Sequence, residues 1–242
     1  MSNQRKPYIR IMSREWNPNI ILSSPDAAWG YLLGAYFGDG HIEFHDCTKQ
    51  FSIVSEDRDL CENCSKATEL LFESPGNVKW RQNHWKLVVC SNKVCKALLD
   101  ACCTNTSYHL ANKHEKKGRL PLLSPSSVVP FLTGLMDSDG WICRKLNGQY
   151  FKYEVGFKNT SPLCREIYAI MSQFYPCNSI SHKPGQSRNG RVGLPYHTWS
   201  INTVGYATKY GFGIRRKDEL CKEFLEYCQC TDKREFVQQT IG

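Results

Sequence analysis

Two aspartates, Asp39 and Asp139, occupy the same place in two similar stretches of this 242-residue chain. Residues 32–40 read LLGAYFGDG and residues 132–140 read LTGLMDSDG, so the second aspartate follows the first by 100 positions. A Ser-Pro dipeptide precedes each stretch at that same offset. Matched spacing of this kind indicates an internal duplication. Two carboxylates in corresponding places of a duplicated unit are candidates for one shared site.

Each stretch is predicted to form the end of a short helix whose small residues lie along one stripe. Small residues let another helix backbone approach closely. The stripes consist of Gly30, Gly34 and Gly38 in the first copy and of Pro130, Gly134 and Ser138 in the second. Gly40 and Gly140 are expected to end the helices by adopting the left-handed conformation. Pro130 would sit late for a first turn, which predicts a helix start nearer Ser127, or a kink.

Asp39 and Asp139 would lie at the negative ends of their helices, where a carboxylate is disfavoured by a few tenths to ~1 kcal/mol. Two helices packed along their stripes would also bring the carboxylates close together. Such an arrangement needs cations, and Mg²⁺, a hard ion that prefers oxygen ligands, suits it best. Two metals ~3.5–4 Å apart can activate a water and stabilise the leaving oxygen of a phosphodiester. The acids therefore predict metal-dependent phosphodiester chemistry.

The two stretches resemble the paired motifs of single-chain LAGLIDADG homing endonucleases. The second copy is a close match, whereas the first is looser, with Phe37 where the family often has an acid. The penultimate acid, which is the metal ligand in the family, is present in both copies as Asp39 and Asp139. The resemblance covers roughly residues 25–230. The alternative is a pair of amphipathic helices whose acids are merely solvated helix ends, but that interpretation does not explain the repeat.

The fold that this resemblance implies is α+β, with two αββαββα halves related by a pseudo-twofold axis and joined at a two-helix seam. Each half would carry a four-stranded antiparallel sheet, and the two sheets would form a saddle over DNA. Strand patterns support this order in both halves, at residues 41–45, 50–54, 78–81 and 85–90, and again at 141–145, 150–158, 178–183 and 196–201. The expected boundaries are an N-terminal basic arm over 1–23, the first half over 24–111, a linker over 112–123 and the second half over 124–242.

The composition permits a nucleic-acid partner, since the net charge is +8 and the sequence pI is about 8.8. The chain has no apolar run of membrane-spanning length and no signal-peptide pattern. An intracellular protein is therefore expected, located wherever its target DNA lies, and its 13 cysteines are expected to be reduced. Cys61 and Cys64 have the spacing of a zinc knuckle, but a second CxxC is missing, so packing on one buried helix face is favoured over metal binding.

The resemblance implies metal-dependent cleavage of both DNA strands at a long target site, across the minor groove, with short 3′ overhangs. Mg²⁺ is the expected cofactor, with Mn²⁺ as the alternative. Asp39 and Asp139 would hold the metals together with the carbonyl groups of Gly38 and Ser138. Further catalytic residues are expected at the end of the second strand of each half and near the last helix of each half. These candidates are Glu56, Asn159 and Lys113, with Arg215 or Lys217 in the second half.

DNA is expected to lie on the two sheets, because a two-stranded ribbon fits the major groove and alternate side chains can reach base edges. For any single residue, an ordinary solvated strand position is an equally good interpretation. In the first half the candidate DNA contacts are His41, Glu43, His45, Lys49, Gln50, Lys79, Arg81 and Lys86. In the second half they are Arg144, Lys145, Gln149, Lys152, Lys183, Arg188 and Arg191.

Two other functions fit the same scaffold. One is an RNA maturase that assists splicing of a host intron, with that intron RNA as its partner. The other is a non-cleaving DNA-binding regulator. Retention of both acids favours the nuclease, whose partner would be double-stranded DNA. Two motifs in one chain also predict a monomer with internal pseudo-dimer symmetry.

Overall fold

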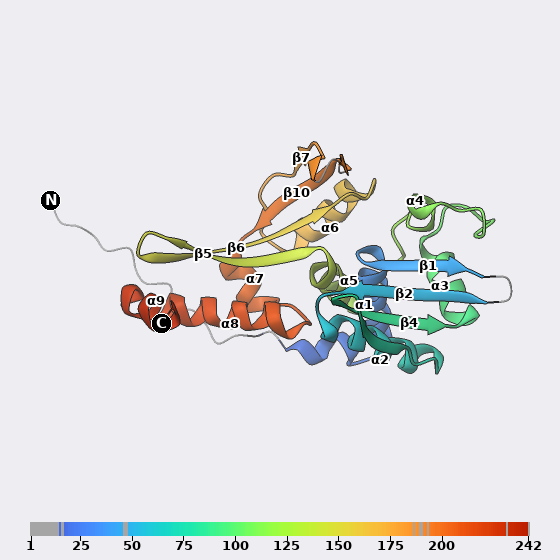
Figure 1. Ribbon diagram of the computed structural model, residues 1–242, viewed down its shortest axis with the longest axis horizontal. Helices are drawn as coiled ribbons and strands as arrows, with labels where there is room; N and C mark the ends of the chain where they lie inside the picture. The colour runs from blue at the N-terminus through green and yellow to red at the C-terminus, as the bar shows by residue number, and fades with distance from the viewer. Residues whose placement is uncertain are drawn as a thin grey trace.

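The computed structural model describes residues 15, 17–45, 48–185, 187–188, 191–192, 194–230 and 232–241. Two similar halves lie side by side and meet at two central helices, α1 and α5 (Figure 1). The α+β architecture expected from the duplicated motif is confirmed.

The first half contains one four-stranded antiparallel sheet covered on one face by helices. Its sheet order is β1-β2-β4-β3. The elements of this half are η1 (Pro18–Leu22), α1 (Pro25–Phe37), β1 (Gly40–Phe44), β2 (Lys49–Ser55), α2 (Arg58–Phe72), β3 (Asn77–Arg81), β4 (His84–Cys90) and α3 (Asn92–Cys102).

The second half repeats this plan with the equivalent order β5-β6-β10-β7 and adds a two-stranded ribbon, β8-β9. The short helix α4 (Lys113–Lys116) lies between the halves. The elements of the second half are α5 (Pro125–Ser138), β5 (Gly140–Asn147), β6 (Tyr150–Asn159), α6 (Cys164–Phe174), β7 (Ser181–Lys183), β8 (Ser187–Arg188), β9 (Arg191–Val192), β10 (Tyr196–Ile201), α7 (Thr203–Lys209), α8 (Arg215–Gln229) and α9 (Lys233–Ile241).

Strand alternation separates a helix-covered face of each sheet from an open face. In β2, Phe51 and Ile53 are fully buried under the helices, whereas Gln50 and Val54 point to the other side. In β6, Val155 and Phe157 are buried in the same way, and Lys152 and Lys158 are exposed on the opposite face. Each half therefore buries one sheet face in its core and leaves the other available to a ligand.

The seam between the halves depends on glycine, because α1 and α5 touch backbone to backbone. A Cβ added at Gly34 would lie 2.0 Å from the carbonyl oxygen of Phe131, and one at Gly134 would lie 2.4 Å from that of Tyr31. Gly30 is equally close to the backbone of α5. The stripe of small residues that the sequence predicted is thus the contact surface, and it fixes where the two helices end relative to each other.

The ends of the two seam helices differ from the expected left-handed caps. Gly148 is the sole glycine with positive φ in the part of the chain that the structure describes. Gly40 and Gly140 are needed for space instead, since a Cβ at Gly40 would lie 2.5 Å from the Cα of Tyr36 and one at Gly140 would lie 2.5 Å from the carbonyl oxygen of Met136. Each strand can therefore begin directly against the last turn of its helix.

Helix α5 begins at Pro125 and continues through Pro130 to Ser138. Its start at Pro125 differs from the start nearer Ser127 that Pro130 suggested. Pro130 lies inside the helix and is buried. Proline removes one backbone donor from a helix interior, which tertiary packing tolerates here.

Three segments have more structure than the sequence indicated. Ile21 of η1 is 3% exposed, so part of the expected 1–23 arm packs against the core, while residues 1–14 and 16 lie outside the described chain. The expected linker over 112–123 includes α4 and the buried Lys117. Helix α9 follows α8 and packs against β6, although no helix was predicted there.

The expectation of packing for Cys61 and Cys64 agrees with the structure. Both thiols are fully buried on one face of α2. Burial raises the pKa of Cys61 to about 11 and raises the pKa of Cys64 well above its ordinary value, so both are protonated thiols at neutral pH. Within the described residues, no three His, Cys, Asp or Glu side chains converge as a metal-binding group.

Candidate functional site

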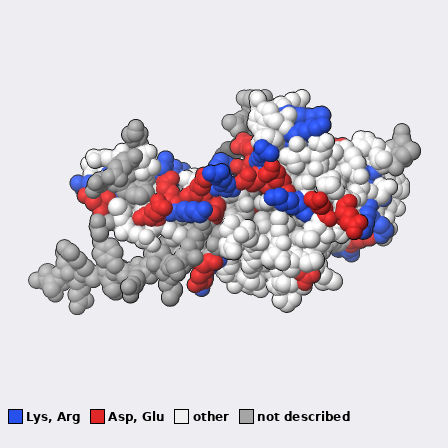
Figure 2. Space-filling model, turned by 90° about the horizontal axis from the view of Figure 1, so that it is seen from below, with Lys and Arg blue, Asp and Glu red and all other residues white. Residues whose placement is uncertain are grey.

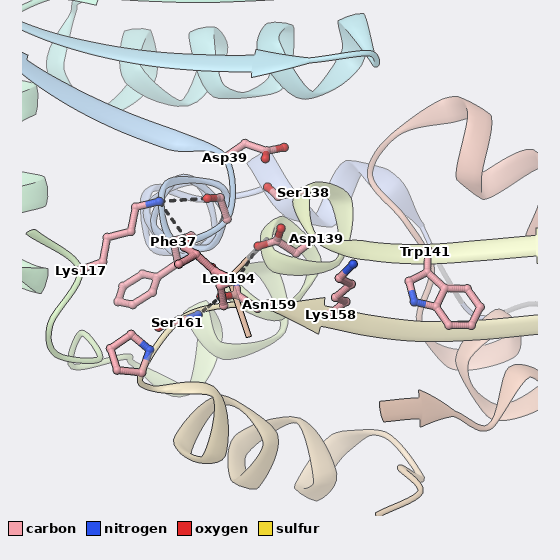
Figure 3. A pocket seen from close by; sticks show the side chains of 13 residues that line it. Phe37, Asp39, Lys117, Ser138, Asp139, Trp141, Lys158, Asn159, Ser161 and Leu194 are labelled. Atoms are coloured by element: carbon pink, nitrogen blue, oxygen red, sulfur yellow. Dashed lines mark hydrogen bonds between the residues drawn. The ribbon is translucent and has the colours of Figure 1, made fainter. Parts of the chain in front are cut away.

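Asp39 and Asp139 line the same pocket at the ends of the seam helices (Figure 3). A Cβ added at Gly38 would lie 2.3 Å from the Cβ of Ser138 and 3.1 Å from Oδ2 of Asp139, so the two helix ends are in contact. Both aspartates are partly exposed, whereas the residues before them in the helices are almost all buried. The glycine seam is therefore what places the two carboxylates in one site.

Asp139 is held by Asn159, one of the residues predicted for the site. The side-chain amide of Asn159 donates a hydrogen bond from Nδ2 to Oδ2 of Asp139 at 2.6 Å. Burial raises the pKa of Asp139 to about 7, with the neighbouring charge of Asp39 acting in the same direction, while Lys117 and the Asn159 contact oppose the shift. A carboxyl in these surroundings gains from a cation placed between it and its neighbour.

Lys117 is a site residue that the sequence prediction missed. Its Nζ donates to the carbonyl oxygens of Phe37 at 3.0 Å and Gly38 at 2.9 Å, at the end of α1. Lys113, the predicted candidate, belongs to α4 in the same segment, and its side chain lies outside the described part. Lys117 precedes Lys217 by 100 positions, the offset of the two aspartates, so the repeat contained the signal needed to find it.

Lys217 is the counterpart in the second half, at the end of α5. Its Nζ donates to the carbonyl oxygens of three residues, at 3.1, 2.6 and 2.7 Å. These acceptors are Met136, Asp137 and Gly140. Burial lowers the pKa of Lys217, and the charge of Asp137 opposes that shift. Each helix end thus has a lysine ammonium against its terminal carbonyls, where the helix dipole is negative.

Asp137 connects the end of α5 to the start of α8, the helix that carries Lys217. Its carboxylate accepts hydrogen bonds from the hydroxyl of Tyr31 at 2.8 Å and from the backbone N–H of Gly213 at 2.9 Å, just before α8. Burial raises its pKa to about 7, whereas the Lys217 charge lowers it. The first motif has the buried Phe37 in the corresponding position. The first motif lacks this acid, and in the second motif Asp137 has a structural role because it links α5 to α1 and to the segment before α8.

Two of the other predicted catalytic candidates, Glu56 and Lys217, line a second pocket next to the first. That pocket contains Asp39, Glu56 and Lys217. Glu56 is exposed at the end of β2. Arg215 points away, because its guanidinium pairs with Glu219 at 2.8 Å along α8. Of the two basic residues proposed for the second half, the structure brings Lys217 to the site.

On the first sheet, the predicted DNA contacts gather mainly on the open face. One hollow is lined by four of them, from three strands: Gln50, Lys79, Arg81 and Lys86. On β1, Nε2 of His41 lies 3.5 Å from Oε1 of Glu43, and Nε2 of His45 lies 3.6 Å from its Oε2. Lys49 differs, since its ammonium lies 5.6 Å from the ring centre of Phe44, which alternation places on the helix-covered side.

On the second sheet, Arg144 and Lys145 point to opposite faces, so a ligand on one face of the sheet would contact only one of these two predicted DNA contacts. Arg144 pairs with Glu223 of α8 at 2.8 Å on the helix-covered side. Lys145 and Lys152 lie on the open face, where both pair with Glu154 at 2.9 and 2.7 Å. Successive side chains on a strand alternate, which excludes two neighbours from one face.

Four further candidates of the second half lie in a turn, on β7 and in the β8-β9 ribbon. Gln149 is exposed in the turn between β5 and β6, and Lys183 is exposed on β7. Arg188 and Arg191 face each other in the β8-β9 register, and their side chains lie outside the described part.

Lys158 also lies on the open face and was missed. Its Nζ lies 4.0 Å from the ring centre of Tyr196, and the residue lines the pocket of the two aspartates. It lies on the same side of β6 as Lys152, so the alternation of side chains along the strand could have identified it as a candidate.

The charged side chains are mixed on the face seen in Figure 2, where basic and acidic groups lie next to one another. Ion pairs within and between α2 and α8 have this character, including Arg58 with Glu62 at 2.7 Å and Arg216 with Asp57 at 2.7 Å. Paired charges of both signs do not make a surface that attracts phosphates. The lysine-lined hollow on the open face of the first sheet is the better polyanion surface.

The oxygen atoms at the pocket could bind a hard divalent cation if the substrate supplied the remaining ligands. Mg²⁺ is typically bound through one or two carboxylates together with waters and substrate phosphates. Asp39 and Asp139 provide two such carboxylates. The carbonyl of Gly38 already accepts a hydrogen bond from Lys117, and its second lone pair is the one left for a cation. The residues present therefore accommodate the ion without a third acid.

The comparisons with known proteins point to one fold. No protein-family model and no curated protein match the chain by sequence. The meganuclease I-SmaMI bound to uncleaveable DNA aligns with a TM-score of 0.52 at 11% identity, over 88% of this chain and 94% of that one. A variant of I-SmaMI aligns with a TM-score of 0.51 at 12% identity, over 93% and 96%. The homing endonuclease I-DmoI with DNA and Mn aligns with a TM-score of 0.46 at 15% identity, over 74% and 91%.

The described helices include none that is long and apolar enough to cross a membrane. Two αββαββα halves, a glycine seam and paired aspartates at its end are what the duplicated motif predicted, and the I-SmaMI alignments cover nearly the whole of both chains. This chain therefore has the two-domain fold of the LAGLIDADG homing endonucleases.

Proposed function

We propose that this protein is a site-specific DNA endonuclease that cuts both strands of a long duplex target in a reaction that needs a divalent metal. The observation that carries this proposal is the placement of Asp39 and Asp139 in one pocket between two open sheet faces. The fold adds support, because a solved structure of I-SmaMI contains DNA. Short 3′ overhangs and the domain boundaries given above belong to the same proposal.

The two carboxylates hold the cation in this mechanism, and Asn159 fixes Oδ2 of Asp139 for that task. When bound, Mg²⁺ would supply Lewis-acid stabilisation of the charge that develops on the scissile phosphate. Lys117 and Lys217 keep positive charge at the two helix ends, where phosphates from both strands would arrive. Each half contributes one aspartate and one lysine, so a single chain can act on two strands as a monomer.

The open faces of the sheets provide the binding surface. Lys79, Arg81 and Lys86 on the first sheet face the same direction as Gln50, which can read base edges. On the second sheet, Lys145, Lys152 and Lys158 occupy the corresponding face, and because Lys145 and Lys152 share the single carboxylate of Glu154, this group of side chains keeps a net positive charge. Basic groups of this kind hold the phosphate backbone and fix the register of the duplex.

The test is cleavage of a randomised duplex library with Mg²⁺ by the wild-type protein and by Asp39→Asn and Asp139→Asn. The exposed Asp100, on α3 and outside both pockets, provides the matched control Asp100→Asn. We expect defined double-strand breaks from the wild type and the control, and nicks or no product from the other two. If the wild type binds duplex specifically but cuts with no divalent metal, the regulator becomes the better proposal. Preference for structured intron RNA would instead favour the maturase.

A further inference from the structure

Trp141 lies beside the paired carboxylates, although neither the motif nor the mechanism uses it. It is the second residue of β5, two positions after Asp139, and it lines both pockets that flank the aspartates. Gly140 and Ile142 on either side of it are buried, whereas Trp141 is partly exposed. The indole is therefore on the open face of the sheet, at the centre of the molecule. Figure 3 shows it together with Lys158 on the β5-β6 side of the pocket.

The neighbouring strand leaves space for the indole. Trp141 pairs with Gly156 in the β5-β6 register. A Cβ added at Gly156 would lie 2.5 Å from Cζ2 and 2.7 Å from Cε2 of Trp141. The six-membered part of the ring therefore rests on the backbone of β6. A large rigid ring seated in this way loses little conformational entropy when its free side meets a ligand.

The first half has a different residue at the corresponding position. The residue 100 positions earlier is His41, which pairs with Ser52 where Trp141 pairs with Gly156. The imidazole of His41 lies near Glu43, with Nε2 and Oε1 3.5 Å apart. The duplicated site is thus asymmetric, because an indole lines the pockets beside the carboxylates in the second half whereas an imidazole occupies the corresponding position in the first.

The position of the carboxylates indicates which part of a duplex the indole would meet. Phosphates of opposite strands approach one another most closely across the minor groove, which is about 6 Å wide in B-DNA. Two adjacent carboxylates that serve both strands must therefore face that groove. Apolar side chains that enter the minor groove partly unstack a base step, and pyrimidine–purine steps yield most easily.

We propose that Trp141 is a positioning residue for the duplex centre, where its indole packs into the minor groove between the two scissile phosphates and partly unstacks one base step. This inference rests on the proposed nuclease function. It makes the cleavage rate depend on the deformability of base pairs that no hydrogen-bonding side chain reads. The dependence is confined to the second-half side of the centre, because His41 replaces the indole on the other side.

The test uses the target recovered from the library and randomises its central base pairs. The variants are Trp141→Ala and Trp141→Phe, and the control is Trp80→Ala, which removes an indole that is 54% exposed on β3 and lines neither pocket. One measurement is the relative cleavage rate on every central sequence. The other is the fluorescence of 2-aminopurine at each central position, with EDTA present so that no strand is cut.

We expect the wild type and the control to raise 2-aminopurine fluorescence at one central position and to cleave flexible centres at least about fivefold faster than stiff ones. Trp141→Ala should lose both effects while its affinity for the duplex stays within about threefold. Trp141→Phe keeps a smaller ring over Gly156 and should retain a weaker signal, so it decides the question if the alanine variant does not fold.

If both Trp141 variants showed the cleavage preferences and the 2-aminopurine fluorescence of the wild type, the inference would be overturned, but the proposed nuclease function would be unaffected. A wild type that cuts its target without preference among central sequences would do the same. A wild type that binds no duplex would overturn the nuclease and this inference together.

Discussion

At the scale of single residues, the site is a balance between two acids that repel each other and two lysines that satisfy helix ends. Asp139 shows the repulsion, since burial and the charge of Asp39 raise its pKa to about 7. Lys117 and Lys217 donate hydrogen bonds to backbone carbonyls at the two helix ends. The ammonium groups are thus held at fixed places beside the carboxylates, and a cation between the two acids relieves their mutual repulsion.

The pKa of Asp139 makes a prediction about the metal-free protein. An acid whose pKa is higher in the folded state than in the unfolded state stabilises the fold at low pH, and that contribution is lost as the pH rises through the folded pKa. Between pH 5 and pH 8 the free energy of unfolding should therefore fall, by on the order of 2 kcal/mol. Asp139→Asn should reduce that fall, and Mg²⁺ added to the wild type at pH 8 should restore stability. Urea unfolding in EDTA measures this, and an unchanged pH dependence in the variant would be evidence against the account.

Lys117 leads to a second prediction at this scale. Lys117→Met removes the ammonium from the pocket, where it contacts the carbonyls of Phe37 and Gly38. Cleavage at saturating DNA should slow by about two orders of magnitude because transition-state charge loses a stabilising group. Binding of the target should change by less than about threefold. The exposed Lys96 on α3 gives the matched control, Lys96→Met. Equal cleavage rates for the two variants would remove Lys117 from the mechanism.

Among single residues, the sequence pointed to the aspartates but not to all their partners. Asp39, Asp139 and Asn159 are reached through the motif and the strand that follows it, and they lie together. Lys117 cannot be identified in this way, because the segment before α5 has weak periodicity and the composition of a linker. Applying the 100-residue offset to Lys217 identifies it. The tie made by Asp137 needs a contact with Gly213, 76 positions away, that no local pattern reveals.

At the scale of elements, the geometry of the site depends on α1 and α5 approaching closely enough for their ends to touch. Gly34 and Gly134 provide the approach, because a Cβ at either position would collide with the facing backbone. The stripe was evident from sequence spacing, because residues four apart share a helix face. The role of Gly40 and Gly140 could not be predicted from spacing. Their φ values are not positive, and each is required because a side chain would collide with the preceding turn of the helix.

The seam gives a prediction about stability. Gly34→Ala places a Cβ 2.0 Å from the carbonyl oxygen of Phe131, and the facing backbone has to move. We expect a loss of about 3 kcal/mol or more in the free energy of unfolding, as for severe overpacking. Gly205→Ala in α7 is the control, because its Cβ would have no contact closer than 3.4 Å. That change should be neutral or stabilising by up to about 1 kcal/mol. Equal stabilities of the two variants would show that the seam is not tightly packed.

At the scale of the whole molecule, two sheets with helices on one side present two open faces beside a central pocket. Period-two alternation in the sequence predicted most of the strands that build them. It also carried the information that separates Arg144 from Lys145, which a grouping by charge alone overlooked. Helix α9 and the β8-β9 ribbon are additions to the second half that the duplication could not predict, because the first half has no copy of them among the described residues.

The two faces of the sheets lead to a prediction about salt dependence. Lys79 lies on the open face of the first sheet, and Arg144 lies on the helix-covered side of the second. Lys79→Gln should reduce the slope of log K against log salt for duplex binding by about 1, through the loss of one phosphate contact. Arg144→Gln should leave that slope unchanged. Fluorescence anisotropy over a range of KCl concentrations measures both, and a larger effect from Arg144 would place the duplex on the wrong face.

The central claim is that Asp39 and Asp139 form one metal-dependent site serving both DNA strands. The most direct measurement is strand-resolved cleavage of the recovered target with Mg²⁺, in which each strand carries its own label. The wild type should cut both strands at positions facing each other across the minor groove, whereas Asp39→Asn and Asp139→Asn should each fail to make the double-strand break. Either variant cutting both strands at the wild-type rate would contradict the account.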